Sequence, residues 1–197
     1  MKQITLIISA LIFSIASFAQ KKFRYTDKNF TYILTVDSTL TDDGVNYDCA
    51  ASSISIWNKG GDTILVQRIE PPQNEFFCNT NKPAVFVLED MNFDGMSDFR
   101  LLQLVPAGPN VPYYYWLYDS KTQQFQQDTS LEEIVAPHFD PVKKIITSSF
   151  RGDPDENNKR TFVKSTYKYI NGKLKLISET EIPEDPKPPG KVPYMRK

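Results

Sequence analysis

The sequence predicts an all-β protein built from antiparallel hairpins, with one short helix. Apolar and polar residues alternate along several segments, and in one of them Phe30, Tyr32 and Leu34 fall on one face together with Val36. Turn-forming residues separate these segments at short intervals. Only one stretch of the sequence carries a helix signature. These three observations favour antiparallel sheets over a helical or mixed fold.

The expected strands follow one another along the chain with turns between them. Asn58-Lys59-Gly60-Gly61 joins two of them, and Asn171-Gly172 joins two more with the dipeptide that best suits a type I′ turn. Both connections therefore predict antiparallel hairpins. Besides 30–36 and 162–169, the segments with strand composition are 54–57, 63–69, 84–88, 99–104, 113–118, 144–150 and 173–182.

The single helix signature is Ser130-Leu131-Glu132-Glu133, the pattern of a capping box. In a capping box the first residue caps the helix and the acidic fourth residue reaches back to it. Pro137 ends any such helix within about two turns, because proline lacks the N–H that a helix interior needs. The sequence therefore predicts one short helix beginning near Ser130.

The first residues have the pattern of a secretory signal peptide. Residues 4–15 form an almost unbroken apolar run that is too short to span a bilayer. Ser17 and Ala19 occupy the positions of small residues before a cleavage site, so we expect a signal peptide over residues 1–19. The alternative is a buried N-terminal strand or helix. Export predicts a periplasmic or secreted protein with no membrane span after cleavage.

The mature chain has the length of one domain, and we expect a single β-rich domain over residues 20–181. Residues 182–197 are rich in proline and lysine, a composition typical of a flexible tail. The formal net charge of the whole chain is −1, so no excess of positive charge points to nucleic acid as a partner.

The chain has two cysteines, Cys49 and Cys78. In an oxidising compartment two cysteines usually form one bridge, whereas a metal or redox site normally shows closer spacing. We therefore expect a Cys49–Cys78 disulfide. Closing a loop of about 30 residues would stabilise the fold by roughly 3.6 kcal/mol in the chain-entropy description.

Residues 90–98 read Asp-Met-Asn-Phe-Asp-Gly-Met-Ser-Asp and have the pattern of a calcium-binding loop. Asp90, Asn92, Asp94 and Asp98 supply oxygen side chains, Met96 supplies its carbonyl, and Gly95 permits a sharp reversal. The flanking segments have strand composition, so the loop resembles those of integrin-type FG-GAP units rather than an EF-hand. We therefore expect Ca²⁺ as a structural ion. The alternative is an acidic turn whose side chains cap backbone groups.

The sequence offers little for catalysis, and we expect no enzymatic activity. His138 lies between Pro137 and Pro141, and no serine or cysteine has a nucleophile-elbow pattern. The most aromatic stretch is Tyr113-Tyr114-Tyr115-Trp116. One face of that strand is expected in the core, and the other either presents an aromatic anchor to a partner or packs in the core as well.

The loop and the residues after it occur in an order that resembles a known family. The shared residues are Asp90-x-Asn92-Phe93-Asp94-Gly95-x-x-Asp98, Gly108-Pro109-Asn110, Tyr115-Trp116-Leu117-Tyr118-Asp119, Phe125, Leu131, Ile134, Pro137, Phe139-Asp140 and Ser148-Ser149-Phe150-Arg151-Gly152. The family comprises small exported calcium-binding bacterial proteins similar to periplasmic inhibitors of invertebrate-type lysozyme, including an immunity protein against a peptidoglycan-cleaving effector of a type IV secretion system. The resemblance implies a propeller-like all-β fold, and a sandwich is the alternative.

The resemblance also implies a function, which is inhibition of, or immunity against, a lysozyme-like peptidoglycan hydrolase. The chain lacks the Ser-Gly dipeptide of such inhibitors, so contact residues are chosen by their chemistry. Arg151 and Ser149 lie in a polar loop region, and an arginine suits the carboxylates of a hydrolase cleft. Tyr114 is the aromatic candidate for partner binding. The alternative function is a carbohydrate or cell-surface binding module with a structural calcium site.

Overall fold

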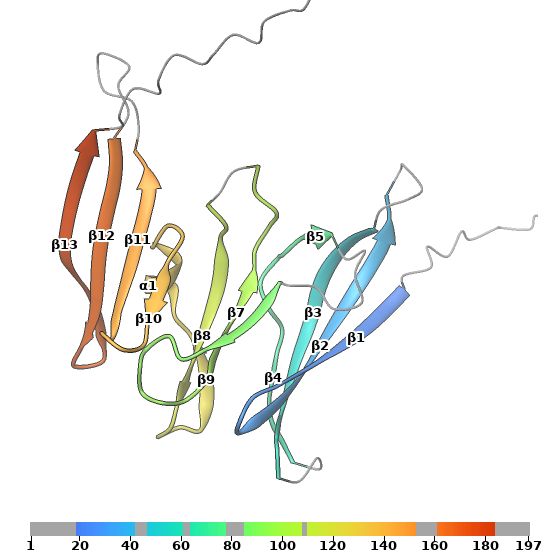
Figure 1. Ribbon diagram of the computed structural model, residues 1–197. Helices are drawn as coiled ribbons and strands as arrows, with labels where there is room; N and C mark the ends of the chain where they lie inside the picture. Colours follow the sequence, from blue (N-terminus) through green and yellow to red (C-terminus); the bar gives the residue numbers. More distant parts are fainter. Residues whose placement is uncertain are drawn as a thin grey trace, which may run out of the picture.

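The computed structural model describes residues 19–41, 47–60, 64–77, 85–107, 110–152 and 161–183. These residues form three antiparallel sheets and one helix of a single turn (Figure 1). The predicted signal peptide lies outside the described residues except for Ala19, which begins the first strand, and the predicted tail lies outside them from residue 184 onward. No helix among the described residues is long and apolar enough to cross a membrane.

Each sheet is made of consecutive strands that pair with their neighbours in chain order. The first sheet contains β1 (Ala19–Thr26), β2 (Phe30–Leu40), β3 (Tyr47–Asn58) and β4 (Leu65–Ile69), with β5 (Phe76–Phe77) also paired to β3. The middle sheet contains β6 (Phe86–Glu89), β7 (Asp98–Leu102), β8 (Tyr113–Asp119) and β9 (Gln124–Gln127). After α1 (Thr129–Glu132), the third sheet contains β10 (His138–Asp140), β11 (Ile145–Arg151), β12 (Thr161–Ile170) and β13 (Lys173–Pro183).

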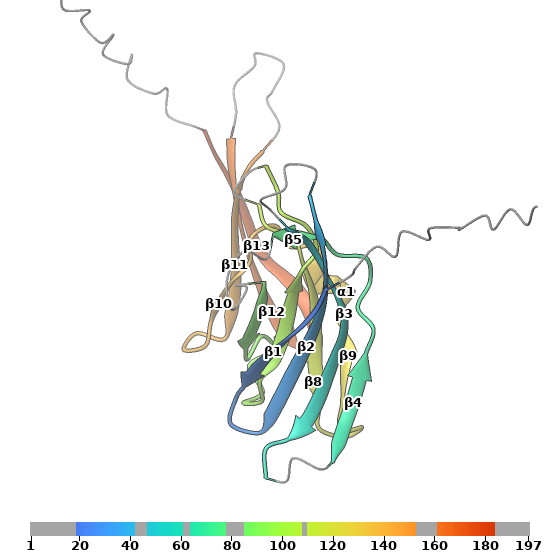
Figure 2. The same ribbon diagram turned by 90° about the vertical axis from the view of Figure 1, so that its right-hand side faces the viewer.

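The predicted all-β class with antiparallel hairpins and one short helix is confirmed. The three sheets stand side by side with their strands in similar directions, as the two perpendicular views show (Figures 1 and 2). Up-and-down sheets that follow one another along the chain have the connectivity of propeller blades, so the propeller-like expectation is compatible with this arrangement.

The first core lies between the first and middle sheets, and aromatic rings dominate it. The alternating residues of β2, from Phe30 through Tyr32 to Val36, are between 0 and 3% exposed, as their spacing predicted. The Tyr32 ring lies 5.8 Å from the ring of Phe99 on β7, which stacks in turn on Trp116 of β8 at 5.0 Å. Such offset and tilted ring pairs add to the hydrophobic stabilisation that burial supplies.

The second core lies between the middle and third sheets. Its buried members are Met91, Phe93, Tyr115, Leu131, Ile134, Phe139 and Ile146. Tyr115 comes from β8, and Phe139 and Ile146 come from the third sheet. Met91 and Phe93 come from the loop between β6 and β7, so this loop is part of the core.

The two predicted hairpin turns are confirmed, since β3 pairs with β4 and β12 pairs with β13. Asn171 and Gly172 both have positive φ angles, 52° and 73°, as a type I′ turn requires. The predicted capping box is wrong, because the helix begins earlier than Ser130. Its N-cap is Asp128, whose carboxylate accepts the backbone N–H groups of Ser130 and Leu131.

Four strands had no prediction, and several boundaries differ. β1, β5, β9 and β10 were not expected, and His138 lies in strand β10 rather than in a turn. β3 begins at Tyr47, before the expected segment 54–57. β13 continues to Pro183, two residues into the segment that we expected to be a tail. Ile182 pairs with Phe162 and Pro183 pairs with Thr161, so β12 supplies the backbone partners of these two residues.

Candidate metal centre

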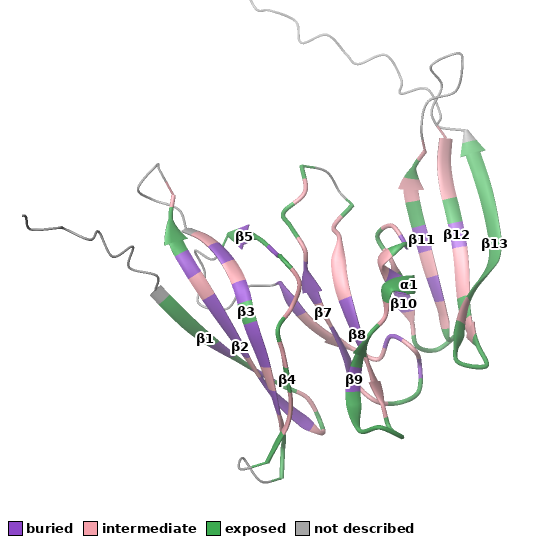
Figure 3. Cartoon of the chain, turned by 180° about the vertical axis from the view of Figure 1, so that it is seen from behind, coloured by how far each residue is buried: buried purple, intermediate pink, exposed green. Residues whose placement is uncertain are grey.

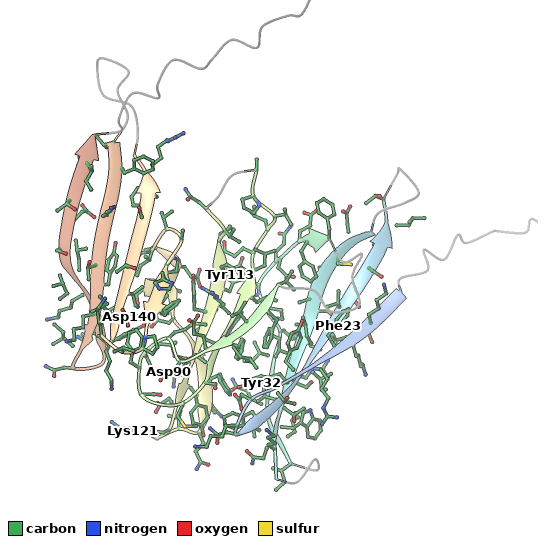
Figure 4. All side chains as sticks on the ribbon, viewed as in Figure 1. Phe23, Tyr32, Asp90, Tyr113, Lys121 and Asp140 are labelled. Carbon is green, nitrogen blue, oxygen red and sulfur yellow. The ribbon has the colours of Figure 1, made fainter. Side chains whose placement is uncertain are left out.

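The loop of residues 90–97 connects β6 to β7, and Asp98 is the first residue of β7. Figure 4 shows Asp90 between the middle and third sheets, on the side where Asp140 of β10 lies. The loop therefore occupies the junction of two sheets. The predicted strand–loop–strand arrangement of this motif is what the structure shows.

The loop reverses direction through two residues with left-handed backbone conformation. Phe93 has a φ of 63° and Gly95 has a φ of 90°. Glycine adopts this region without steric cost, whereas phenylalanine does so only when its surroundings hold it there. The Phe93 side chain is 7% exposed in the second core, and burial of the ring compensates for the unfavourable backbone.

The oxygen side chains of the loop point toward the loop backbone. The Asp90 carboxylate accepts the N–H groups of Asp94 (3.1 Å) and Gly95 (2.9 Å). The Asn92 side-chain oxygen also accepts the Asp94 N–H, at 3.0 Å, and the Asp94 carboxylate accepts the Met96 N–H at 2.8 Å. The Asn92 and Asp94 bonds span two residues, as in an Asx turn, while the Asp90 bonds span four and five residues, and together they fix the loop around these side chains.

Asp98 is the most enclosed of the four residues, with no exposed surface. One carboxylate oxygen accepts the N–H of Tyr118 on β8 at 2.9 Å, and the other accepts the N–H of Met91 at 2.8 Å. Burial raises the pKa of Asp98 to about 7, against the lowering effect of these two hydrogen bonds, and the charges of Asp94 and Asp90 raise it further. Within the described part of the chain, no ion pair to Asp98 offsets its negative charge.

The apolar side chains of the loop connect it to all three sheets. Met91 is fully buried and lies with Phe93 in the second core, while Met96 packs against the first core. The Met96 sulfur accepts a weak hydrogen bond from Asn29 in the β1–β2 turn, at 3.7 Å. The Lys144 ammonium, in the β10–β11 turn, donates to the carbonyl of Phe93 at 3.2 Å. The loop is therefore a contact point of the first, middle and third sheets.

The donor set of the loop suits calcium in chemistry and in order. Carboxylate, amide and carbonyl oxygens are the ligands that this hard cation takes, usually six to eight of them. Asp90 and Asp94 lie near enough to Asp98 to act on its pKa. Over the described residues, however, no three His, Cys, Asp or Glu side chains gather closely enough to hold a metal ion. Calcium would therefore need the carboxylates to turn part of the way from the backbone toward a common centre.

The structure separates the three residues that we selected for partner binding. Tyr114 packs against the first core, and its hydroxyl donates to the carbonyl of Gln73 at 3.0 Å. Ser149 and Arg151 are exposed on β11 of the third sheet. The Arg151 guanidinium carbon lies 5.7 Å from the ring centre of Phe162 on β12. Tyr114 and Arg151 thus belong to different sheets and different surroundings.

The aromatic stretch of β8 packs in the core on both faces. Tyr115 is 2% exposed in the second core, and Trp116 is 3% exposed in the first core. Successive residues of a strand point to opposite faces, so burial of this pair means that the sheets on either side cover β8. The structure therefore supports core packing for Tyr115 and Trp116 of this stretch.

Cys49 is buried on β3, and Cys78 lies outside the described residues, so the disulfide stays a prediction. β5 ends at Phe77, one residue before Cys78 in the sequence. Phe77 pairs with Asp48, and Phe76 pairs with Cys49. The backbone next to one cysteine therefore lies against the backbone of the other, which supports the proposed pairing.

Sequence reasoning missed Arg100, which joins the middle and third sheets. Its guanidinium carbon lies 4.8 Å from the ring centre of Tyr113 and 5.6 Å from that of Phe139 on β10. It also forms an ion pair of 3.5 Å with Glu89, the end residue of β6. The signal in the sequence is a single charged residue within the apolar run Phe99–Leu102. Such a residue is buried only with partners that compensate its charge.

In comparisons with known proteins, no family model matches the chain, and no curated protein sequence matches it significantly. The family that the loop and its following residues resemble is therefore an expectation from those motifs alone, and it enters the functional argument as a proposal.

Proposed function

We propose that this chain is an exported protein in which Ca²⁺, bound by the loop of residues 90–98, stabilises the junction between the middle and third sheets. The observation that supports the proposal is the double role of the loop. Its oxygen side chains surround the turn, and its apolar side chains, Met91 and Phe93, are buried in the second core. An ion that orders this loop would also order the core that joins the two sheets.

Electrostatics gives the physical reason for a cation. Asp90, Asp94 and Asp98 bring three carboxylates into one short loop, and like charges in close proximity disfavour the folded loop. A divalent cation would offset two of the three charges and would replace repulsion by coordination. The residues that would hold it are Asp90, Asn92, Asp94 and Asp98 through their side chains and Met96 through its carbonyl oxygen.

Thermal unfolding of the mature protein tests the proposal. At a calcium concentration about a hundredfold above Kd, binding to the folded state alone should add roughly 2.7 kcal/mol to the free energy of unfolding. The thermal midpoint should rise when calcium is added and fall back to its calcium-free value after EDTA. Asp94→Ala should abolish the response, because Asp94 is an exposed ligand candidate whose loss leaves the core intact. A thermal midpoint that changes with neither calcium nor EDTA contradicts the proposal.

Asp119→Ala is the matched control for this experiment. Asp119 is an acidic residue that lines the same surface groove as Asp94, but its carboxylate accepts the N–H of Lys121 in the β8–β9 turn. This substitution removes a nearby negative charge without removing a ligand candidate. The calcium response should therefore persist in Asp119→Ala.

We further propose that the third sheet provides the partner surface, with a lysozyme-like peptidoglycan hydrolase as the partner. The support is the motif resemblance together with the exposure of Arg151 and Ser149 on β11. A guanidinium at the exposed end of a strand can form a two-point pair with a carboxylate of the hydrolase cleft. Tyr114 is less suited to the role, since its hydroxyl is already bonded to Gln73.

Inhibition curves against muramidases test the partner proposal. Arg151→Ala should weaken binding by about 2 kcal/mol or more if the arginine is desolvated in the complex, whereas Tyr114→Ala should weaken it less. Arg151→Ala should keep the thermal midpoint of the wild type, whereas Tyr114→Ala should lower it, because Tyr114 packs against the first core. Both variants should keep the calcium response. If Tyr114→Ala alone weakens inhibition, the contact surface lies near the middle sheet instead, and if no muramidase is inhibited, the proposal of a hydrolase partner fails.

A further inference from the structure

A groove of about 820 Å³ lies between the β1–β2 turn, the β8–β9 turn and the adjoining ends of β3 and β4. The β1–β2 and β8–β9 turns lie at the lower end of the molecule in Figure 1. A volume of this size falls within the range of roughly 300 to 1,000 Å³ that small-molecule sites occupy. The groove is distinct from the calcium loop, whose oxygen side chains do not line it.

The rim of the groove is polar and carries positive charge. Four side-chain amides line it, from Asn29, Asn58, Gln123 and Gln124, together with the lysines Lys28 and Lys59. Among the described residues, the lining contains no carboxylate. Asp27, the nearest acid in the β1–β2 turn, accepts the N–H groups of Asn29 and Phe30 and the hydroxyl of Tyr32, so its charge is directed into the protein. A ligand in the groove therefore meets hydrogen-bonding amides and ammonium groups.

The inner wall of the groove is apolar and aromatic. Tyr118 lines it, and its ring lies 5.1 Å from that of the buried Phe30. Val66 and Ile64 complete this wall, and Ile64 is 62% exposed. An apolar wall beside a rim of amides offers both kinds of contact that a sugar ring uses, since its C–H face packs on apolar groups and its hydroxyls pair with amides.

Hydrogen bonds between the strands and turns hold the groove in shape. The Gln67 amide on β4 accepts the N–H of Phe125 at 2.7 Å and donates to the Phe125 carbonyl at 3.0 Å, which joins β4 to β9. The Lys59 backbone N–H donates to the Asn29 carbonyl at 2.9 Å, which joins the β3–β4 turn to the β1–β2 turn. The walls are thus fixed before a ligand arrives, and binding would lose little conformational entropy.

A second groove, of about 460 Å³, carries negative charge. Its lining includes Asp94, Asp119 and Asp128. Tyr118 belongs to the lining of both grooves, so the lysine-bearing and aspartate-bearing surfaces are neighbours. An anionic ligand would be attracted to the first groove and repelled from the second, so charge favours binding in the first groove.

We infer that the groove beside the β1–β2 and β8–β9 turns binds an acidic saccharide, that is, a sugar chain bearing carboxylates. The amides would pair with the hydroxyls, the aromatic wall would receive the ring face, and Lys28 and Lys59 would pair with the carboxylates. This inference does not depend on calcium binding or on a hydrolase partner. It assigns a glycan site to a part of the molecule that neither proposal uses.

Titration calorimetry with an oligogalacturonate, compared with a neutral galactose oligomer of the same linkage and length, tests the inference. The acidic oligomer should bind, and its affinity should fall as salt rises, because exposed charges are screened. Lys28→Gln should lower that affinity by about tenfold, the effect of losing one charge-assisted hydrogen bond. Gln124→Ala should lower affinity for the same oligomer without changing the salt dependence.

Lys121→Gln is the matched control, since Lys121 belongs to the β8–β9 turn (Figure 4) but is not among the residues that line the groove. It removes the same charge nearby and should leave the affinity unchanged. Equal binding of the neutral and acidic oligomers overturns the assignment of an acidic ligand. No binding of either oligomer, or an equal loss in Lys28→Gln and Lys121→Gln, overturns the site itself. Thermal midpoints of the variants separate these outcomes from misfolding.

Discussion

The middle and third sheets differ in how the rest of the molecule covers them. In the middle sheet both faces are buried, with Phe99 and Trp116 in the first core and Tyr115 in the second. In the third sheet Phe139 and Ile146 are buried, but Leu176 and Ile177 of β13 are 51% and 53% exposed. Figure 3 shows the same contrast, with buried segments concentrated in the first and middle sheets.

This difference indicates which part of the fold depends on the loop of residues 90–97. The first and middle sheets share a large aromatic core to which the loop contributes only the partly buried Met96. The third sheet is attached through a smaller core, in which two of the buried side chains, Met91 and Phe93, come from the loop itself. The large aromatic core therefore stabilises the first and middle sheets, and the loop is one of the contacts that attach the third sheet.

The largest expected effect is in the middle sheet. Phe99 is fully buried and packs on Tyr32, Phe86, Trp116 and Phe125. Phe99→Ala should lower the free energy of unfolding by about 3 to 5 kcal/mol, because it removes a large side chain and leaves a cavity. Leu176→Ala, on the half-exposed β13, should cost less than about 1 kcal/mol. Urea denaturation of both variants compares the two sheets, and equal losses would contradict the contrast.

A somewhat smaller effect is expected from the loop. Met91→Ala should cost about 2 to 3 kcal/mol through the cavity in the second core. Limited trypsin digestion should then cut first within the third sheet, at Lys164 or Lys168 on β12, while the first sheet stays intact. Met96→Ala is the control, since Met96 packs against the first core and is partly exposed. Equal digestion of all three sheets in Met91→Ala would contradict the assignment of third-sheet attachment to the loop.

Arg100 provides a test of the junction that does not alter the loop. Arg100→Gln should cost about 1 to 2 kcal/mol, because it removes cation–π contacts with Tyr113 and with Phe139 across the two sheets. Glu89→Gln should cost less, about 0 to 1 kcal/mol, since it breaks only the ion pair. Chemical denaturation of the two variants measures both losses of unfolding free energy. A larger loss in Glu89→Gln would mean that the ion pair, rather than ring stacking, holds Arg100.

The last effect is confined to alkaline pH. Burial raises the pKa of Tyr115 to about 12, although Arg100 acts to lower it, and burial raises that of Tyr25 to about 12. Between pH 10 and 12 the unfolded chain loses these phenolic protons and the folded chain keeps them, so stability should fall as pH rises through this window. Tyr115→Phe and Tyr25→Phe should each reduce the slope measured by denaturation across this range. An unchanged slope would contradict the burial of these hydroxyls.

Much of the fold was predictable because local patterns and tertiary burial agree. The alternation in β2, the Asn171-Gly172 turn and the flanking strands of the calcium-type loop are all encoded within a few residues. β1 was missed although Phe23 and Tyr25 alternate with charged residues, because these positions directly follow the signal-peptide pattern. β10 was missed because it has three residues between prolines, and its pairing with β11 supplies what its sequence does not.

The candidate site was predictable in composition but not in arrangement. The spacing of residues 90–98 identifies the oxygen side chains, yet it does not reveal that Asp98 is fully buried against Tyr118, twenty residues away. The burial of Tyr115 and Trp116 on opposite faces depends on how three sheets pack, which no single strand encodes. The polar groove is formed by turns from the first and middle sheets, so its lining residues are scattered along the sequence.

Amide hydrogen exchange in calcium and in EDTA is the most direct test of the central claim. If calcium orders the loop and the loop attaches the third sheet, calcium should slow exchange in residues 90–98 and in β11 and β12, and should change β2 and β3 much less. Asp94→Ala should remove this protection. If calcium leaves exchange in the loop and the third sheet unchanged, or protects all three sheets equally in the wild type and in Asp94→Ala, the loop neither binds the ion nor joins the sheets.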